Sequence, residues 1–277
     1  MKEDSVVARL PMLGPPHGST IHVMTYNLRH TGDSPPRDWA RRRALVRRLI
    51  TAERPTLLGT QEATYRQVRD LSDDLPDYGS VWLSREGGSD GESMAIFYRR
   101  DRLRPLEFGH LWLSDTPQTM ASMSWGNEVP RMLTWVRFFD LSTGVTFGHL
   151  NTHFDHQSEK ARLRSAGMVR QWAAEFDAPV IVTGDFNDGQ ATPPHLELTG
   201  GGLTDTWDRA ARHVTPRYAT FNDWNASPFD GGAIDWILAT DDVDVLTTGI
   251  NTWAPGRRVP SDHWPVQALL TVSDRGA

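Results

Sequence analysis

Polar side chains repeatedly follow apolar segments of this sequence, and their types are those that bind cations and anions. They include carboxylates, amides and imidazoles, while the whole chain contains no cysteine. Because strand ends converge in layered α/β folds, side chains at such positions can assemble into one site. The polar clusters occupy residues 25–27, 61–62, 151–156, 184–188, 234–236 and 261–264.

The carboxylates in these clusters favour a hard divalent cation. Oxygen ligands from Asp and Glu suit Mg²⁺ or Mn²⁺, and the lack of Cys excludes thiolate zinc sites and cysteine nucleophiles. Imidazole and amide groups add hydrogen-bond donors for phosphate oxygens. The sequence contains neither the G-x-S-x-G turn of serine hydrolases nor the G-x-x-x-x-G-K-[ST] loop that holds nucleotides.

Each cluster taken alone also has an ordinary structural explanation. Asn27, Asp185 and Asn187 are types that form turns, and Glu62 suits the start of a helix. Isolated histidines are more often structural than catalytic. Asp235 is harder to explain in this way, because it interrupts an apolar run and a buried carboxylate is costly unless it is paired.

Hydrophobic periodicity predicts the elements that position these clusters. Helices are predicted over 37–53, 64–74 and 157–176, and strands over 21–26, 56–60, 78–84, 93–99, 103–113, 131–140, 144–153, 180–183, 233–239 and 265–272, with loops elsewhere in the last third. This number of strands argues against a simple doubly wound sheet. We expect an α/β (α+β) fold in which two packed mixed β-sheets are flanked by helices.

Composition and local sequence limit the domain organisation and the function. Proline and glycine residues predict a flexible leader over 1–19, and residues 20–277 predict a single domain. The 277-residue chain has a net charge of −6, whereas proteins that bind duplex nucleic acid non-specifically are usually basic. Neither a secretory signal nor an apolar run of ~18 residues is present. We therefore expect a cytoplasmic protein with no membrane partner and no obligate protein partner.

Six motifs occur in a fixed order along the chain: Tyr26-Asn27, Gln61-Glu62, Asn151-Thr152-His153, Gly184-Asp185-Phe186-Asn187, Ile234-Asp235-Trp236 and Ser261-Asp262-His263. In combination they resemble the endonuclease/exonuclease/phosphatase superfamily, which includes the deoxyribonuclease-I-like enzymes. The resemblance covers residues 21–272 and is closest to small bacterial members of uncertain substrate. It implies a four-layered α/β sandwich.

The resemblance also implies a reaction, namely metal-assisted hydrolysis of a phosphate ester by an in-line water molecule. Mg²⁺ is the implied cofactor, with Mn²⁺ as an alternative. Glu62 would be the main metal ligand, assisted by Asn27 and by Asp262 near the ion. Asp185 would orient and deprotonate the attacking water, and Asn187 would donate a hydrogen bond to a phosphoryl oxygen.

Histidines complete the site implied by the resemblance. His263 would bind the phosphate or protonate the leaving group, with Asp235 fixing its tautomer and raising its pKa. His153 would be a second imidazole in contact with the phosphate. We add Arg131 as a phosphate clamp, because guanidinium groups match phosphate oxygens. A salt bridge at an interface or at a sheet edge is the alternative explanation for Arg131.

One position departs from the family's pattern and bears on the substrate. Arg29 stands two residues after Asn27, where apurinic endonucleases and exonuclease III often carry an acid. The departure favours a single bound ion, or an arginine that engages substrate phosphate, over a DNA-repair enzyme. The expected substrate is a phosphorylated small molecule, a nucleotide or a short nucleic acid. The alternative function is a non-catalytic phosphate-binding module that retains the fold.

Further side chains near predicted loops have two possible roles. Asp155 and His156 either orient His153 or shape the loop before the helix at 157–176. Tryptophans near loops either stack on a base or sugar or pack in the core, which is the commoner role. These tryptophans are Trp112, Trp125, Trp224 and Trp253.

Overall fold

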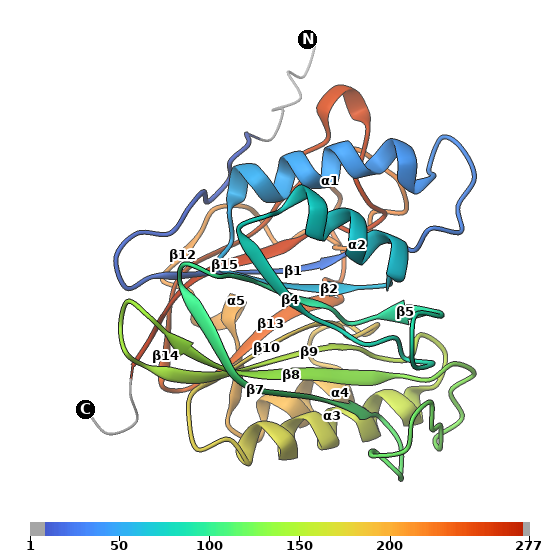
Figure 1. Cartoon of the computed structure of the whole chain (residues 1–277), viewed down its shortest axis with the longest axis vertical. Helices are drawn as coiled ribbons and strands as arrows, with labels where there is room; N and C mark the ends of the chain where they lie inside the picture. The colour runs from blue at the N-terminus through green and yellow to red at the C-terminus, as the bar shows by residue number, and fades with distance from the viewer. Residues whose placement is uncertain (1–8, 274–277) are drawn as a thin grey trace.

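Two large β-sheets pack face to face, and helices cover the outer side of each sheet (Figure 1). The structure is a computed structural model that describes residues 9–273. Helices α1 (Trp39–Glu53) and α2 (Tyr65–Asp74) cover one sheet, and α3 (Glu159–Ala174) and α4 (Pro193–Thr199) cover the other. The predicted fold class, a four-layered α/β sandwich, is confirmed.

The two sheets are mixed, with parallel and antiparallel neighbours. Within the described residues, the first sheet has the order β12 (Arg212–His213), β14 (Val243–Ile250), β15 (Val266–Val272), β1 (Ile21–Asn27), β2 (Leu57–Gln61), β6 (Ile96–Arg99) and β4 (Tyr78–Val81). The second has the order β11 (Leu203–Asp205), β13 (Asp235–Thr240), β10 (Val180–Asp185), β9 (Thr146–His153), β8 (Met132–Asp140) and β7 (Leu103–Trp112). The remaining elements are the short pair β3 (Ala63–Thr64) and β5 (Glu92–Ser93), helix α5 (Thr206–Arg209) and a 3₁₀ turn at Pro255–Arg257.

Each sheet contains a parallel pair of strands that are joined by a long helix. Strands β1 and β2 are parallel neighbours linked through α1, and β9 and β10 are parallel neighbours linked through α3. Such a crossover places the carboxyl ends of both strands at the same edge of the sheet. Asn27 is therefore in register with Gln61, and His153 is in register with Asp185.

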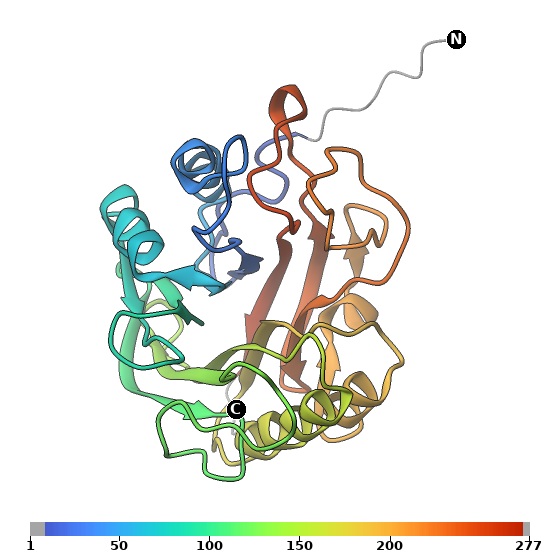
Figure 2. The ribbon, with the colours of Figure 1, turned by 90° about the vertical axis from the view of Figure 1, so that its right-hand side faces the viewer.

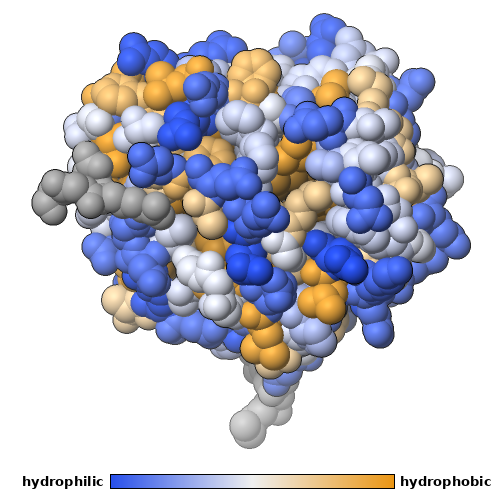
Figure 3. All heavy atoms as spheres, turned by 90° about the horizontal axis from the view of Figure 1, so that it is seen from below, coloured by the Kyte–Doolittle hydropathy of each residue, from blue (hydrophilic) through white to orange (hydrophobic). Residues whose placement is uncertain are grey.

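Most of the core lies in one apolar layer between the sheets and one under each helix pair. Neighbouring residues of a strand face opposite sides of its sheet. Val23 accordingly packs in the layer between the sheets with Phe138, whereas Met24 packs under α1 with Leu49. Hydrophilic residues are spread over the lower face of the molecule among smaller groups of hydrophobic residues (Figure 3). No helix in the described part of the chain is long and apolar enough to cross a membrane.

The two sheets approach each other closely near the strand ends, and this approach requires a glycine at position 59. Gly59 of β2 faces Asn151 and Thr183 of the other sheet, and a Cβ at Gly59 would lie 2.5 Å from Asn151 Oδ1. Asn151 receives a 2.8 Å hydrogen bond from Gln61, which links the two sheets directly behind the strand ends. The absence of a side chain at Gly59 allows this polar contact.

The last third of the chain differs from the prediction, because several predicted loops there are regular elements. Strand β14 was missed because a bulge between Val245 and Thr247 breaks its alternation of apolar and polar residues. Helix α4 was missed because it opens with Pro193 and Pro194, residues that a helix accepts in its first turn. Earlier in the chain, the predicted strand at 93–99 is divided into β5 and β6.

The described part of the predicted leader contacts α1. Backbone N–H groups of Leu13 and Gly14 donate to Glu53 Oε2 at 3.1 and 2.9 Å, and Met12 donates to Oε1 of the same carboxylate. Asn251 donates to Glu53 Oε1 at 2.9 Å. Residues 1–8 of the leader lie outside the described residues.

Candidate active site

The carboxyl ends of the central strands surround a cavity of about 360 Å³ at one edge of the sandwich. This edge faces the viewer in Figure 2. Two of the nine predicted site residues, Asn27 and Asp235, lie behind its wall in contact with lining residues. The others line the cavity: Glu62, Arg131, His153, Asp185, Asn187, Asp262 and His263.

The backbone is left-handed at three of the strand ends that form this cavity. Arg29, Glu62 and Asn187 follow β1, β2 and β10 with φ angles of 54°, 58° and 51°, and all three side chains line the cavity. Asn adopts this conformation readily, but Glu and Arg do so at a cost of about 1–2 kcal/mol each. Strain of this kind is concentrated at functional sites.

Asn27 joins a carboxylate from one sheet to a carboxylate from the other. Its Nδ2 donates to Glu62 Oε1 at 3.0 Å and to Asp185 Oδ2 at 2.9 Å. Its Oδ1 accepts a hydrogen bond from the Arg29 backbone N–H at 2.9 Å. Glu62 Oε2 accepts a further bond from the His30 N–H at 3.1 Å. In this arrangement Asn27 orients the two carboxylates, and its amide oxygen faces away from Glu62 and Asp185.

The carboxylates differ in how their surroundings shift their pKa values. Burial favours the neutral form of Glu62, but the Asn27 hydrogen bond and the charges of His263 and Arg29 lower the pKa of Glu62 below its ordinary value. Burial and the neighbouring carboxylate of Asp235 raise the pKa of Asp185 to about 7. Near neutral pH, Glu62 is therefore charged while Asp185 exchanges a proton easily.

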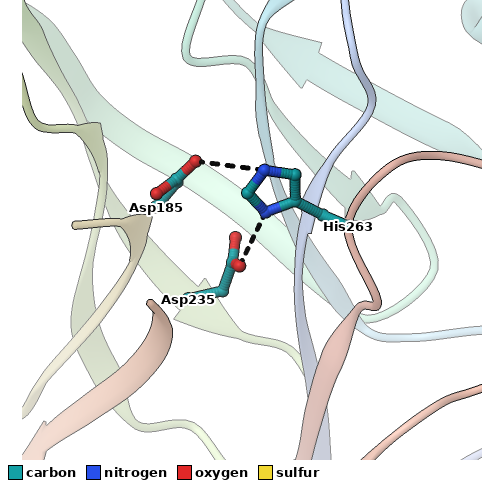
Figure 4. A group of neighbouring side chains, drawn as sticks. All are labelled: Asp185, Asp235 and His263. Carbon is teal, nitrogen blue, oxygen red and sulfur yellow. Dashed lines mark hydrogen bonds and ion pairs between the residues drawn. The ribbon is translucent and has the colours of Figure 1, made fainter. Parts of the chain in front are cut away.

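His263 lies between two carboxylates, as Figure 4 shows. Its Nδ1 is 2.8 Å from Asp235 Oδ2, and its Nε2 is 3.7 Å from Asp185 Oδ2. Burial opposes a charge on the ring, but Asp235 and Asp185 outweigh burial and raise the pKa of His263 to about 10. The imidazole is therefore a cation at neutral pH. Asp235 is in register with Asp185 on the neighbouring strand, which explains why both carboxylates reach the same ring.

His153 has the opposite electrostatic environment. Burial, and then the nearby positive charges of Arg131 and Arg85, lower the pKa of His153 well below its ordinary value. The neutral ring accepts a 3.0 Å hydrogen bond at Nε2 from the side chain of Asn187, which places its proton on Nδ1. The backbone N–H of Asn187 donates to Asp185 Oδ1 at 3.0 Å. His153 and Asn187 thus form a neutral hydrogen-bonded pair beside Asp185.

Arg131 forms a salt bridge, the alternative explanation of its sequence position, and its side chain also lines the cavity. Its Nε is 3.5 Å from Asp155 Oδ2, and its Nη2 is 2.9 Å from His156 Nδ1. Its Nη1 is buried, has no hydrogen-bond partner among the described residues, and belongs to a side chain that lines the cavity. Asp155 also accepts bonds from the backbone of Gln157 and Ser158, so it shapes the turn that leads into α3.

This geometry agrees with what comparisons with known proteins show. The chain matches the model of the endonuclease/exonuclease/phosphatase family over residues 24–263. It belongs to this family. The family's members are hydrolytic phosphoesterases that depend on a divalent metal, and the predicted resemblance is confirmed.

Two solved structures and one viral protein illustrate the relationship. A family member from Bacteroides thetaiotaomicron has 31% sequence identity and a TM-score of 0.88, with 93% of this chain and 100% of that chain covered. A mannosyl-6-phosphatase from the same organism has 31% identity and a TM-score of 0.84, with 90% and 99% covered. An uncharacterized protein of Acanthamoeba polyphaga mimivirus is 29% identical over 160 residues, which span 54% of this chain and 59% of the viral protein.

The donors in the cavity fit the divalent metal of the family. Glu62 and Asp262 present carboxylate oxygens, the ligand type that Mg²⁺ and Mn²⁺ prefer. The Arg29 guanidinium lies near both, with Nη1 3.9 Å from Glu62 Oε2 and Nε 3.6 Å from Asp262 Oδ2. Ligand atoms of Asp185, Asp235 and His263 also lie within 4.8 Å of one another. Nδ1 of that histidine is already engaged by Asp235.

Sequence reasoning missed one wall of the cavity. Arg85 and Glu92 line it, and Arg85 Nη1 is 2.8 Å from Glu92 Oε2. Arg85 also pairs with Glu86, whose carboxylate lies 3.0 Å from its Nε. The segment between Glu86 and Glu92 contains a turn with Gly87 and Gly88, both at positive φ. The opposite charges on either side of this glycine turn were the available signal.

The tryptophans near loops are mostly core residues. Trp112, Trp125 and Trp253 are buried, with 4%, 7% and 4% of their surfaces exposed. The half-buried Trp224 packs against the guanidinium groups of Arg37 and Arg42. For the three buried residues, the packing role predicted as the commoner one applies.

Proposed function

We propose that the protein is a divalent-cation-dependent phosphoesterase, with Mg²⁺ as its ion and Mn²⁺ as a substitute. The observation that carries the proposal is that Glu62, Asp185 and His263, which are far apart in sequence, line one cavity. Glu62 and Asp262 would hold the ion, and Asn27 would fix the direction of the Glu62 carboxylate. When bound, the ion supplies charge stabilisation at the phosphoryl oxygen and the leaving group.

The remaining residues would bind the substrate and move protons. Asp185, with a pKa raised to about 7, suits a general base that orients water and accepts its proton near neutral pH. The His263 cation would donate from Nε2 to a phosphate oxygen or to the leaving group, while Asp235 holds Nδ1. Asn187 and Arg131 would donate to phosphoryl oxygens as their charge increases.

We infer that the substrate is a small phosphorylated molecule, such as a phosphorylated sugar or a nucleotide. A cavity of about 360 Å³ is in the range that accommodates small ligands. The net charge of −6 argues against tight binding of duplex nucleic acid. The similarity to a mannosyl-6-phosphatase supports a phosphate monoester carried on a sugar.

The decisive experiment compares the wild type with Asp185→Asn and the control Asp188→Asn. Asp188 follows closely in sequence but pairs with Arg162 at 2.8 Å rather than lining the cavity. Substrates are p-nitrophenyl phosphate, its bis ester, mannose 6-phosphate and a nucleotide, each with Mg²⁺, Mn²⁺ or EDTA. We expect turnover that requires metal, a loss of about 10²–10⁴-fold in Asp185→Asn, and near-wild-type rates in the control. Absence of metal-dependent turnover on every substrate would favour a non-catalytic phosphate-binding module instead.

A further inference from the structure

A second cavity, of about 530 Å³, opens beside the first turns of α1. Its lining includes five arginines and a tryptophan, and no Asp or Glu, in a chain whose net charge is −6. In Figure 2 the red loop before β15 lies between α1 and the orange loop that precedes β13, and these three segments provide the lining. The residues that matter are Arg37, Arg41, Arg42, Trp224, Arg257 and Arg258; we call this the arginine cavity.

Arg42 places a buried positive charge in the wall of the arginine cavity. The residue is 2% exposed, and its guanidinium donates only to backbone carbonyls in the described part of the chain, including Leu28 O at 2.6 Å and Pro260 O at 3.1 Å. Carbonyl oxygens satisfy its N–H groups without neutralising its charge. Two further acceptors, the carbonyls of Arg29 and His30, belong to residues that line the active-site cavity. The two cavities are therefore separated by a shared wall.

The other arginines of this cavity retain free hydrogen-bonding capacity. Among the described residues, Arg37, Arg257 and Arg258 form no ion pair, whereas Arg41 is paired with Asp38 at 2.7 Å. The Arg37 Cζ atom lies 5.2 Å from the centre of the Trp224 ring, and the Arg42 Cζ atom lies 5.4 Å from it. A cation–π contact positions a guanidinium but leaves its N–H groups available.

We propose that the arginine cavity binds a phosphate-rich ligand, at a site separate from the phosphate that is hydrolysed. Guanidinium groups bind phosphate through paired hydrogen bonds, and several unpaired guanidinium groups around one cavity suit a ligand with several negative charges. Arg258 precedes Asp262 by four residues, so their Cα atoms are at most about 14 Å apart. The ligand is thus either a further phosphate of an extended substrate, which rests on the proposed function, or a separate polyphosphate.

Direct binding tests the site without relying on catalysis. Inorganic tripolyphosphate is titrated calorimetrically in EDTA into the wild type, the double variant Arg37→Gln/Arg258→Gln, and a control double variant, Arg164→Gln/Arg212→Gln. The control removes the same charge from exposed arginines that form no ion pair among the described residues. We expect at least tenfold weaker binding in the cavity variant and a change below twofold in the control. Equal affinities in the two variants, or no binding by the wild type, would overturn the proposal.

A second variant tests the arginine cavity without changing its charge. Trp224→Leu keeps every arginine but deletes the ring that positions Arg37, and we expect intermediate weakening of tripolyphosphate binding. Thermal unfolding checks that each variant is folded. Unchanged binding in a folded Trp224→Leu protein together with unchanged binding in Arg37→Gln/Arg258→Gln would contradict the role of this cavity.

Kinetics distinguish the two sources of the ligand. If the phosphate belongs to an extended substrate, Arg37→Gln/Arg258→Gln raises KM for a short 5′-phosphorylated oligothymidylate at least tenfold, with kcat and the KM for p-nitrophenyl phosphate unchanged. If the ligand is a separate polyphosphate, tripolyphosphate binding is lost while both KM values stay the same. If the protein hydrolyses neither ester, the proposed function fails, and the calorimetric comparison still decides the arginine cavity.

Discussion

The pairing of Asp235 with His263 predicts how much activity is lost when the Asp235 carboxylate is removed. Asp235→Asn removes the buried carboxylate that lies 2.8 Å from His263 Nδ1. The rise in the pKa of His263 from 6.5 to about 10 corresponds to about 5 kcal/mol in favour of the imidazolium, to which Asp235 contributes more than Asp185. We therefore expect kcat/KM to fall by about 10²–10⁴-fold on p-nitrophenyl phosphate at saturating Mg²⁺.

The pairing also predicts the direction in which the pH–rate profile shifts. In the wild type, His263 carries its proton below about pH 10, so its titration does not limit the rate near neutral pH. Removing the Asp235 charge lowers the pKa of His263, so the alkaline decline of kcat/KM should move to lower pH in Asp235→Asn. Rates between pH 6 and 10 for both proteins measure this shift. A profile that keeps its alkaline limb in place would show that the carboxylate does not control the imidazole.

A double-mutant cycle tests whether the two residues act as one unit. His263→Ala should lose at least as much activity as Asp235→Asn, and the double variant should lose little more than His263→Ala alone. Losses that multiply would refute the pairing. The control is Asp205→Asn, because Asp205 forms another buried contact with a histidine, 3.4 Å from His195, among residues that do not line the active-site cavity. That variant should retain its activity at temperatures where it remains folded.

Further predictions concern the metal, the pH dependence of stability and the N-terminal segment. Glu62→Gln should raise the Mg²⁺ concentration needed for half-maximal activity at least tenfold, which a metal titration measures. Burial lowers the pKa of His149 to about 3. As the pH falls below 6.5, this histidine therefore becomes protonated in the unfolded chain while it stays neutral in the folded protein. His149 should therefore reduce stability by about 2 kcal/mol between pH 7 and pH 5, and urea unfolding of His149→Gln should show a correspondingly flatter dependence. Glu53→Ala should lower the free energy of unfolding by about 2–4 kcal/mol, because the backbone N–H groups of residues 12–14 and the side chain of Asn251 lose their acceptor.

The layers of the fold could be predicted because their signals are local. The alternation in β1 and the apolar stripes of α1 and α3 are visible in the sequence, and each predicted helix lies within a few residues of the observed one. β14 could not be predicted in the same way, because a bulge is a feature of the pairing with β15 rather than of one strand. The Arg85–Glu92 wall escaped prediction for a related reason, since its two halves meet only when a turn folds back.

The residues that face the cavity were identifiable by type, but their conformation was not. Nothing in the sequence indicates that Arg29 and Glu62 adopt left-handed backbone angles, where glycine would be less strained. Interactions of these two side chains must offset the free-energy cost of the left-handed backbone. Glu62 accepts hydrogen bonds from Asn27 and His30, and Arg29 pairs with Asp33 at 3.0 Å. A core formed only for stability requires neither these clustered charges nor the strained turns that present them. Their concentration around one cavity is expected where charged side chains have to be held against a cation and a phosphate ester.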